Sequence, residues 1–106
     1  MLLNGDDNGM NGEVTRIVLD GDVDISTADR IRSIVEAECR RGSSRVVIDL
    51  SAVEFVDSHG LHLFAETHRK LMRDERVLVL VPPPDVVWRP FVITGLDGVF
   101  MVDPDA

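Results

Sequence analysis

The residues best suited to chemistry lie in one short turn, Asp57-Ser58-His59-Gly60, between an apolar run and a segment of helical periodicity. The first N–H groups of a helix have no partner within the helix, and the helix dipole adds partial positive charge there. A short polar side chain at a helix start either only caps the helix or takes a direct part in the protein's function. From the residues alone, both interpretations of Asp57 and Ser58 stay open.

The same turn begins a polar face that carries side chains able to bind a metal ion. His59, His62 and Glu66 lie on one outward face of the predicted helix, at about 100° per residue. With Asp57 as a fourth ligand, they form an alternative site for a divalent metal. A merely solvated polar face is the commoner arrangement, and the sequence has no HExxH or paired-cysteine motif. We therefore predict no metal site and no other cofactor.

Motifs of catalysis are missing from the sequence. It has no nucleophile elbow, no glycine loop for phosphates and no cofactor fingerprint, so we expect no enzymatic activity. His68 lies among apolar residues and is predicted to be a core histidine whose polar end is satisfied. Cys39 is predicted to be a small buried hydrophobic residue.

A predicted inner strand positions the turn. Residues 45–50 form an almost unbroken apolar run rich in β-branched side chains, which is typical of a strand buried on both faces. A second apolar patch, 53–56, leads to the turn. Helical spacing then predicts a helix that begins near Gly60. Its inward stripe is expected at Leu61, Phe64, Ala65, His68, Leu71 and Met72.

The rest of the chain alternates between strand and helix patterns. Residues 13–19 predict a strand with Thr15, Ile17 and Leu19 on one face, followed by a tight acidic loop at 20–24. A helix over 28–41 is expected to begin at an N-cap, Thr27, and to bury Ile31, Ile34, Val35 and Cys39. The later elements are an inner strand at 77–81, a helix at 85–94 that Pro90 shortens or kinks, and a strand at 99–102.

This alternation implies parallel strands joined by right-handed crossovers. We predict a single α/β domain whose mixed, largely parallel sheet of four to five strands is covered by about three helices. Residues 1–12 are expected to form a flexible or edge-strand segment, residues 13–102 the domain, and residues 103–106 a short tail.

Composition narrows the class of partner. The 106 residues carry a net charge of −8, which disfavours both nucleic acid and anionic membrane surfaces. The sequence has no apolar run long enough to span a bilayer and no secretion signal. A single cysteine suits a reducing cytosol, so we expect a cytoplasmic protein that binds a protein or a small molecule.

Three pieces of the chain resemble, in order and spacing, the STAS domain of anti-sigma factor antagonists. The resemblance covers roughly residues 13–102. The matching pieces are Gly21-Asp22-Val23-Asp24 with Ser26-Thr27-Ala28-Asp29, Val47-Ile48-Asp49-Leu50 with Phe55-Val56-Asp57-Ser58-His59-Gly60-Leu61, and Thr94-Gly95-Leu96-Asp97.

The resemblance implies a partner-switching protein that regulates transcription. In such proteins an anti-sigma factor with serine kinase activity phosphorylates the serine of the turn, here Ser58. The unphosphorylated form binds the anti-sigma factor and frees the sigma factor, and a PP2C-type phosphatase resets the switch. The partner surface is then expected to include Asp24, Asp57, His59, Gly60 and His62. Phosphorylation would add about −1.5 to −2 charges, which N–H groups at the helix start could hold.

Departures from the family pattern keep an alternative open. His59 stands where the family usually has a second serine or threonine, and His62 and Glu66 stand where small residues are common. A STAS scaffold or transport-system subunit, acting by protein binding without phosphorylation, is the alternative function. We also expect the family's usual final helix to be missing, so that the apolar surface it would cover is either exposed or used for self-association, for example in a homodimer.

Overall fold

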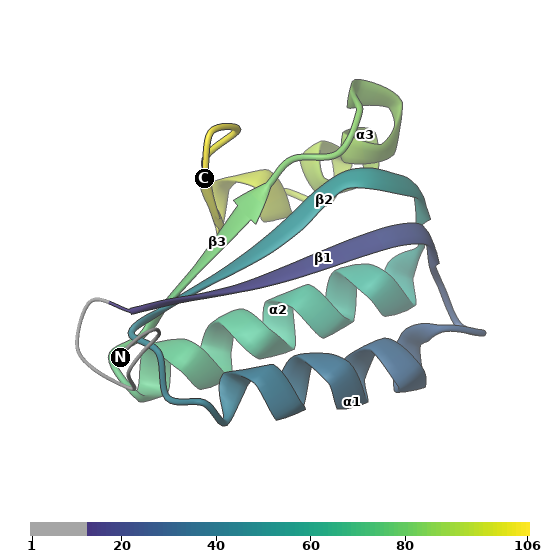
Figure 1. Ribbon diagram of the computed structural model, residues 1–106. Helices are drawn as coiled ribbons and strands as arrows, with labels where there is room; N and C mark the ends of the chain where they lie inside the picture. Colours follow the sequence, from purple (N-terminus) through teal and green to yellow (C-terminus); the bar gives the residue numbers. More distant parts are fainter. Residues whose placement is uncertain (1–12) are drawn as a thin grey trace.

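The computed structural model describes residues 13–106 as a four-stranded parallel sheet in the order β1-β2-β3-β4. The elements are β1 (Val14–Val23), α1 (Ala28–Cys39), β2 (Arg45–Val56), α2 (Ser58–Arg73), β3 (Val77–Val81), α3 (Asp85–Ile93), the 3-10 helix η1 (Leu96–Gly98) and β4 (Met101–Val102) (Figure 1). The predicted α/β class is confirmed. The expectation for residues 1–12 lies outside the described residues.

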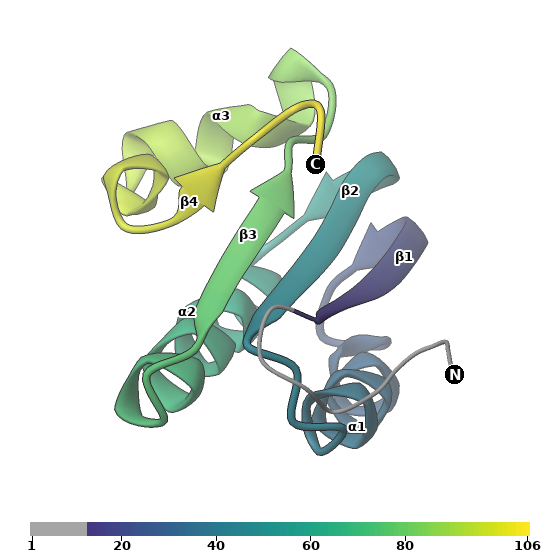
Figure 2. The ribbon, with the colours of Figure 1, turned by 60° about the vertical axis from the view of Figure 1, so that its left-hand side comes forward.

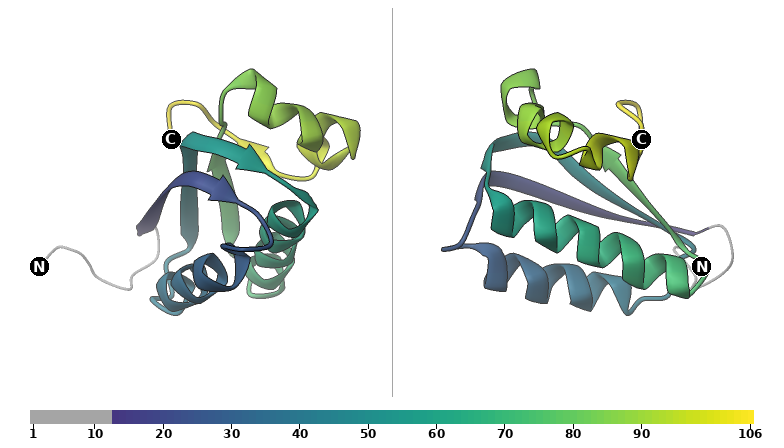
Figure 3. Two further views of the ribbon diagram at one scale, coloured as in Figure 1. Left: turned by 90° about the vertical axis from the view of Figure 1, so that its right-hand side faces the viewer. Right: turned by 180° about the vertical axis from the view of Figure 1, so that it is seen from behind.

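Two helices, α1 and α2, form a layer on one face of the sheet (Figures 1 and 3). α1 and α2 run side by side beneath the strands, as Figures 1 and 3 show, while α3 lies beyond the carboxyl end of β3 (Figure 2). Ion pairs join α1 to α2: Arg32 Nε lies 3.4 Å from Glu66 Oε1, and Lys70 Nζ lies 3.2 Å from Glu36 Oε2. No helix within residues 13–106 has both the length and the apolar character needed to cross a membrane.

The inner strands are buried on both faces, as predicted. The larger core lies between the sheet and the helices and includes Ile48 and Leu80. On the opposite face Val47 and Val79 are register partners in β2 and β3, and they form a small second cluster with Val81. The 103–106 segment packs back onto this face, where Ala106 contacts the second cluster.

Strands β1 and β2 are both longer than predicted. The acidic loop expected at 20–24 is wrong, because β1 continues to Val23. The register against β2 shifts twice, between Val18 and Asp20 and between Gly21 and Asp22, and each time β2 contributes one extra residue. The alternation of buried and exposed residues continues through β1 and is interrupted in β2. β2 likewise runs unbroken to Val56, so the two strands end side by side.

The helix boundaries and buried stripes also differ from expectation. α1 ends at Cys39 rather than Arg41, and Gly42 closes the turn with φ +84°. Ile34 and Met72 were expected inside but are 45% and 59% exposed. Leu63 and Thr67 are buried in α2 instead, so the inward face of that helix is rotated from the predicted stripe.

The carboxyl-terminal half shows smaller differences. Pro90 does not shorten α3, which reaches Ile93 and closes where Thr94 donates its N–H and hydroxyl to the Pro90 carbonyl at 3.1 and 2.7 Å. The strand expected at 99–102 is only Met101–Val102. The buried Nδ1 of His68 finds no hydrogen-bond partner within residues 13–106, contrary to the expectation that its polar end is satisfied, and the ring meets Phe100 edge-on. Cys39 is only partly buried.

The double burial of β2 and β3 predicts a stability effect. Val47→Ala and Val79→Ala should each lower the free energy of unfolding by about 1–3 kcal/mol, through lost burial and a new cavity. Val18→Ala is the matched control, because Val18 is an exposed strand valine, and it should change stability by less than about 0.5 kcal/mol. Urea denaturation measures all three; equal losses at the buried and exposed valines would contradict the assignment.

Candidate functional site

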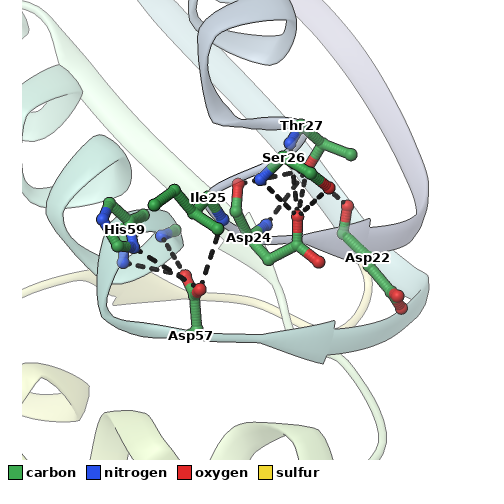
Figure 4. Close-up of polar contacts among 8 residues, drawn as sticks. Asp22, Asp24, Ile25, Ser26, Thr27, Asp57 and His59 are labelled. Atoms are coloured by element: carbon green, nitrogen blue, oxygen red, sulfur yellow. Dashed lines mark hydrogen bonds and ion pairs between the residues drawn. The ribbon is translucent and has the colours of Figure 1, made fainter.

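The site is built where β1 and β2 end. Val23 and Val56 are paired in the parallel ladder, so the chain leaves both strands at the same edge of the sheet. The N–H of Asp57 donates to the Val23 carbonyl at 3.2 Å, which continues the pairing one step further. The loop between β1 and α1 therefore lies against the turn between β2 and α2 (Figure 4).

Asp57 joins these two connections through its carboxylate. Oδ1 accepts hydrogen bonds from the N–H groups of His59 and Gly60 at 2.8 and 3.2 Å, which caps α2. Oδ2 accepts from the N–H of Ile25, in the opposite loop, at 3.2 Å. Desolvation acts to raise the pKa of Asp57, but the three backbone donors outweigh it and hold that pKa below its ordinary value. Asp57 is thus a charged link at neutral pH.

Asp24 organises its own loop. Its Oδ1 accepts from the Ser26 hydroxyl at 2.7 Å and from the N–H groups of Ser26 and Thr27 at 2.9 and 3.2 Å. The Ser26 hydroxyl is the main cause that lowers the pKa of Asp24. Thr27 occupies the N-cap position of α1 as predicted but makes no side-chain cap bond; its hydroxyl donates instead to the Asp22 carbonyl at 2.8 Å.

Ser58 is exposed and is the first residue of α2. Asp57, not Ser58, caps the helix, and no hydrogen bond of the Ser58 hydroxyl is found within residues 13–106. Ser58 borders a surface depression, which we call the Ser58 hollow. Its lining consists of Ile25, Ala28, Asp29, Arg32, Ser58, His59 and His62.

Gly60 is buried and lets α2 approach the end of β1 closely. A Cβ atom at this position would lie 2.6 Å from the Val23 carbonyl oxygen and 2.9 Å from side-chain carbons of Val23 and Val56. Its backbone N–H is also one of the donors to Asp57. Gly60 therefore acts on the site through packing rather than by presenting a side chain.

The polar face of α2 does not form the alternative metal site. His59 Nδ1 lies 3.5 Å from Asp57 Oδ2 and His62 lines the Ser58 hollow, but Glu66 pairs with Arg32 and Lys70. Among the described residues, no group of three or more His, Cys, Asp or Glu side chains is placed to hold a metal ion.

Two residues at the site were missed by sequence reasoning. Ile25 is 70% exposed between polar neighbours, and Arg32 brings a cation from α1 to the Ser58 hollow. The position of Ile25, an isoleucine between polar loop residues, could have indicated an exposed apolar contact in the sequence. Nothing in the sequence indicated a role for Arg32, because only the packing of α1 against α2 brings it to the Ser58 hollow.

The chain is similar to known proteins in both sequence and fold. The STAS domain family model matches residues 10–105. An anti-sigma-B factor antagonist of Listeria monocytogenes is 30% identical, over 81% of this chain and 75% of its own length. The crystal structure of an anti-sigma factor antagonist from Mycobacterium paratuberculosis superimposes with a TM-score of 0.73 and 34% identity, covering 96% of this chain and 83% of that chain. The antagonist SpoIIAA in its unphosphorylated form has the same fold, with a TM-score of 0.72 and 23% identity over 86% of this chain and 80% of its own.

The link through Asp57 predicts a pH-dependent loss of stability. Asp57→Ala should lower the free energy of unfolding by about 0.5–2 kcal/mol at pH 7, and Asp57→Asn by less, because an amide oxygen still accepts hydrogen bonds. The lowered pKa of Asp57 means that the carboxylate's contribution is complete above its ordinary pKa and is lost as pH falls through the lower, folded-state value. Denaturation at pH 7 and about pH 3 should show a smaller difference between wild type and Asp57→Asn at pH 3 than at pH 7; a difference of equal size at both would refute the charged link.

The close approach at Gly60 predicts a second stability effect. Gly60→Ala should destabilise the protein by about 1–3 kcal/mol, since the methyl group meets backbone and a buried valine. Gly98→Ala is the control, because a Cβ there meets nothing within 4 Å and the glycine has no positive φ. Thermal unfolding compares the two variants, and a neutral Gly60→Ala would contradict the packing described.

Proposed function

Because the chain belongs to the STAS domain family, we propose that it is an anti-sigma factor antagonist that phosphorylation of Ser58 switches off. The family consists of non-enzymatic protein-binding regulators, which agrees with the prediction that the chain is not an enzyme. In this proposal the unphosphorylated protein binds an anti-sigma factor with serine kinase activity in the cytoplasm, and a PP2C-type phosphatase restores that form. Sigma-factor-dependent transcription is the process regulated.

The observation that supports the proposal is the exposure of Ser58 at the start of α2. Its hydroxyl is exposed at the first position of α2, and Asp57 already performs the capping that the serine could otherwise provide. A kinase can therefore reach the hydroxyl without unfolding the helix. Modification would leave the Asp57 link, and so the fold of the site, in place.

The partner surface proposed around Ser58 combines the two connections at the sheet edge. Asp57, His59 and His62 contribute from the turn and α2, and Gly60 sets the position of α2 against β1. Asp24 contributes by holding the loop that presents Ile25. Ile25 supplies exposed apolar area to a surface that is otherwise polar, as the centres of protein interfaces require.

Phosphorylation would oppose binding through charge and bulk. The added group of about −1.5 to −2 charges would stand beside Asp57 and Asp29, in an interface that has to lose its water. An unpaired or like-charged group in such an interface costs a few kcal/mol. The switch thus needs no change of fold in this protein.

Binding of charge variants tests the proposal. Ser58→Ala should bind the cognate anti-sigma factor as well as wild type, whereas Ser58→Asp should bind about 10²-fold or more weakly, as one desolvated like charge predicts. Ser33→Asp places the same charge at an exposed serine of α1 and should have little effect. Isothermal titration calorimetry gives the affinities, and mass spectrometry after incubation with kinase and ATP locates the phosphate.

Two outcomes would count against the phosphorylation switch. One is equal affinity of Ser58→Ala and Ser58→Asp for a verified partner. The other is an unmodified Ser58 after incubation with an active cognate kinase. Either result with binding intact would favour the alternative of a STAS scaffold or transport-system subunit that acts without phosphorylation.

A further inference from the structure

Three N–H groups near the start of α2 are already bonded. The Asp57 carboxylate takes the N–H groups of His59 and Gly60 at 2.8 and 3.2 Å. The N–H of Leu61 donates to the Asp57 carbonyl at 3.0 Å. These three N–H groups are therefore not available to a phosphoryl group on Ser58, which needs further partners.

The Ser58 hollow offers one cationic side chain on the side of α1 and two imidazoles on the side of α2. Arg32 reaches it from α1, and His59 and His62 reach it from α2. The guanidinium of Arg32 is held by Nε at 3.4 Å from Glu66 Oε1, while Nη1 lies 3.0 Å from Asp29 Oδ1. The Asp29 side chain is fully exposed, so this i,i+3 pair adds little stability and exchanges readily for a stronger anion.

We propose that the Ser58 hollow is a seat for the phosphoryl group of phosphorylated Ser58, held by Arg32 and, when protonated, by His59 and His62. This inference rests on the proposed function, since it concerns the modified serine. Arg32 keeps its Nε contact with Glu66 and turns its Nη donors from Asp29 to the phosphate oxygens, because guanidinium and phosphate match in a two-point contact. Seated in this way, the phosphate links α2 to α1.

Acidic side chains also surround the seat. Asp57 faces His59 at 3.5 Å from the turn, Asp29 lines the hollow from α1, and Glu66 faces Arg32 from α2. These three carboxylates oppose a phosphate dianion. The guanidinium of Arg32 and the ammonium of Lys70, which lies 4.0 Å from Glu66 Oε2, offset part of their charge.

Phosphorus NMR of the modified protein tests the seat without a kinase or a partner. Phosphoserine is installed at position 58 by co-translational incorporation, and the phosphate is titrated by its ³¹P chemical shift. A neighbouring cation favours the dianion and lowers the pKa of the phosphate. Arg32→Gln should therefore raise that pKa by about half a unit or more, and Arg32→Lys should restore part of the difference. The double variant His59→Gln/His62→Gln should also raise it.

Arg30→Gln is the matched control. Arg30 is exposed on the same helix and does not line the Ser58 hollow, so the change removes the same charge from the protein without touching the seat. Its effect on the phosphate pKa should be less than half that of Arg32→Gln. Circular dichroism of each variant establishes that the fold is kept.

The outcomes separate this inference from the proposed function. Identical phosphate titrations in wild type, Arg32→Gln and Arg30→Gln would overturn the seat, while the binding difference between Ser58→Ala and Ser58→Asp would stand unaffected. Equal effects of Arg32→Gln and Arg30→Gln would also overturn it, because they would indicate net charge alone. A larger effect at Arg32, with partial rescue by lysine, supports the seat even where no kinase modifies Ser58.

Discussion

The carboxylate of Asp57 is the interaction on which the site depends. One oxygen caps α2 and the other holds the loop after β1 through the N–H of Ile25. A single side chain thereby fixes two connections that are 32 residues apart in the chain. Because Asp57 caps α2, the neighbouring Ser58 is not needed as a cap. Ser58 is exposed, and its hydroxyl makes no hydrogen bond within residues 13–106. A charged group can therefore be added to Ser58 without removing a contact that stabilises the fold.

The parallel sheet makes this arrangement possible. The carboxyl ends of neighbouring parallel strands meet at one edge, so β1 and β2 deliver their following loops to the same place. Two register shifts, each with an extra residue in β2, lie along this pair, and the strands stay paired up to Val23 and Val56. Gly60 then allows α2 to start directly against this edge. The exposed turn thus follows a strand, β2, whose residues 46–48 are buried on both faces, and functional residues are often carried on loops that such a scaffold positions.

The charged groups around Ser58 differ between the turn and the side that faces α1. On the proposed partner surface lie Asp57, from the turn, and an exposed apolar residue, Ile25, from the loop after β1. Toward α1, Arg32 links to Glu66 and lines the same hollow as the two histidines. A phosphate on the serine would weaken contact on the first side and gain contacts on the second. The same modification could therefore lower affinity for a partner and still be tolerated by the folded protein.

The sequence by itself determined the α/β class, the doubly buried strands with Val47 and Val79, and the chemical character of the turn, because hydrophobic period and capping residues are local signals. Only tertiary structure decided that Asp57 rather than Ser58 caps α2, that β1 extends to Val23, and that Arg32 lies beside the turn. The last two depend on contacts between segments distant in the chain, namely the strand pairing that holds Val23 and the α1–α2 packing that places Arg32. The Asp57 cap is a local contact with His59 and Gly60, but the sequence left open which of two adjacent residues makes it. Local patterns do not encode such contacts, since strand register and helix rotation are set by packing.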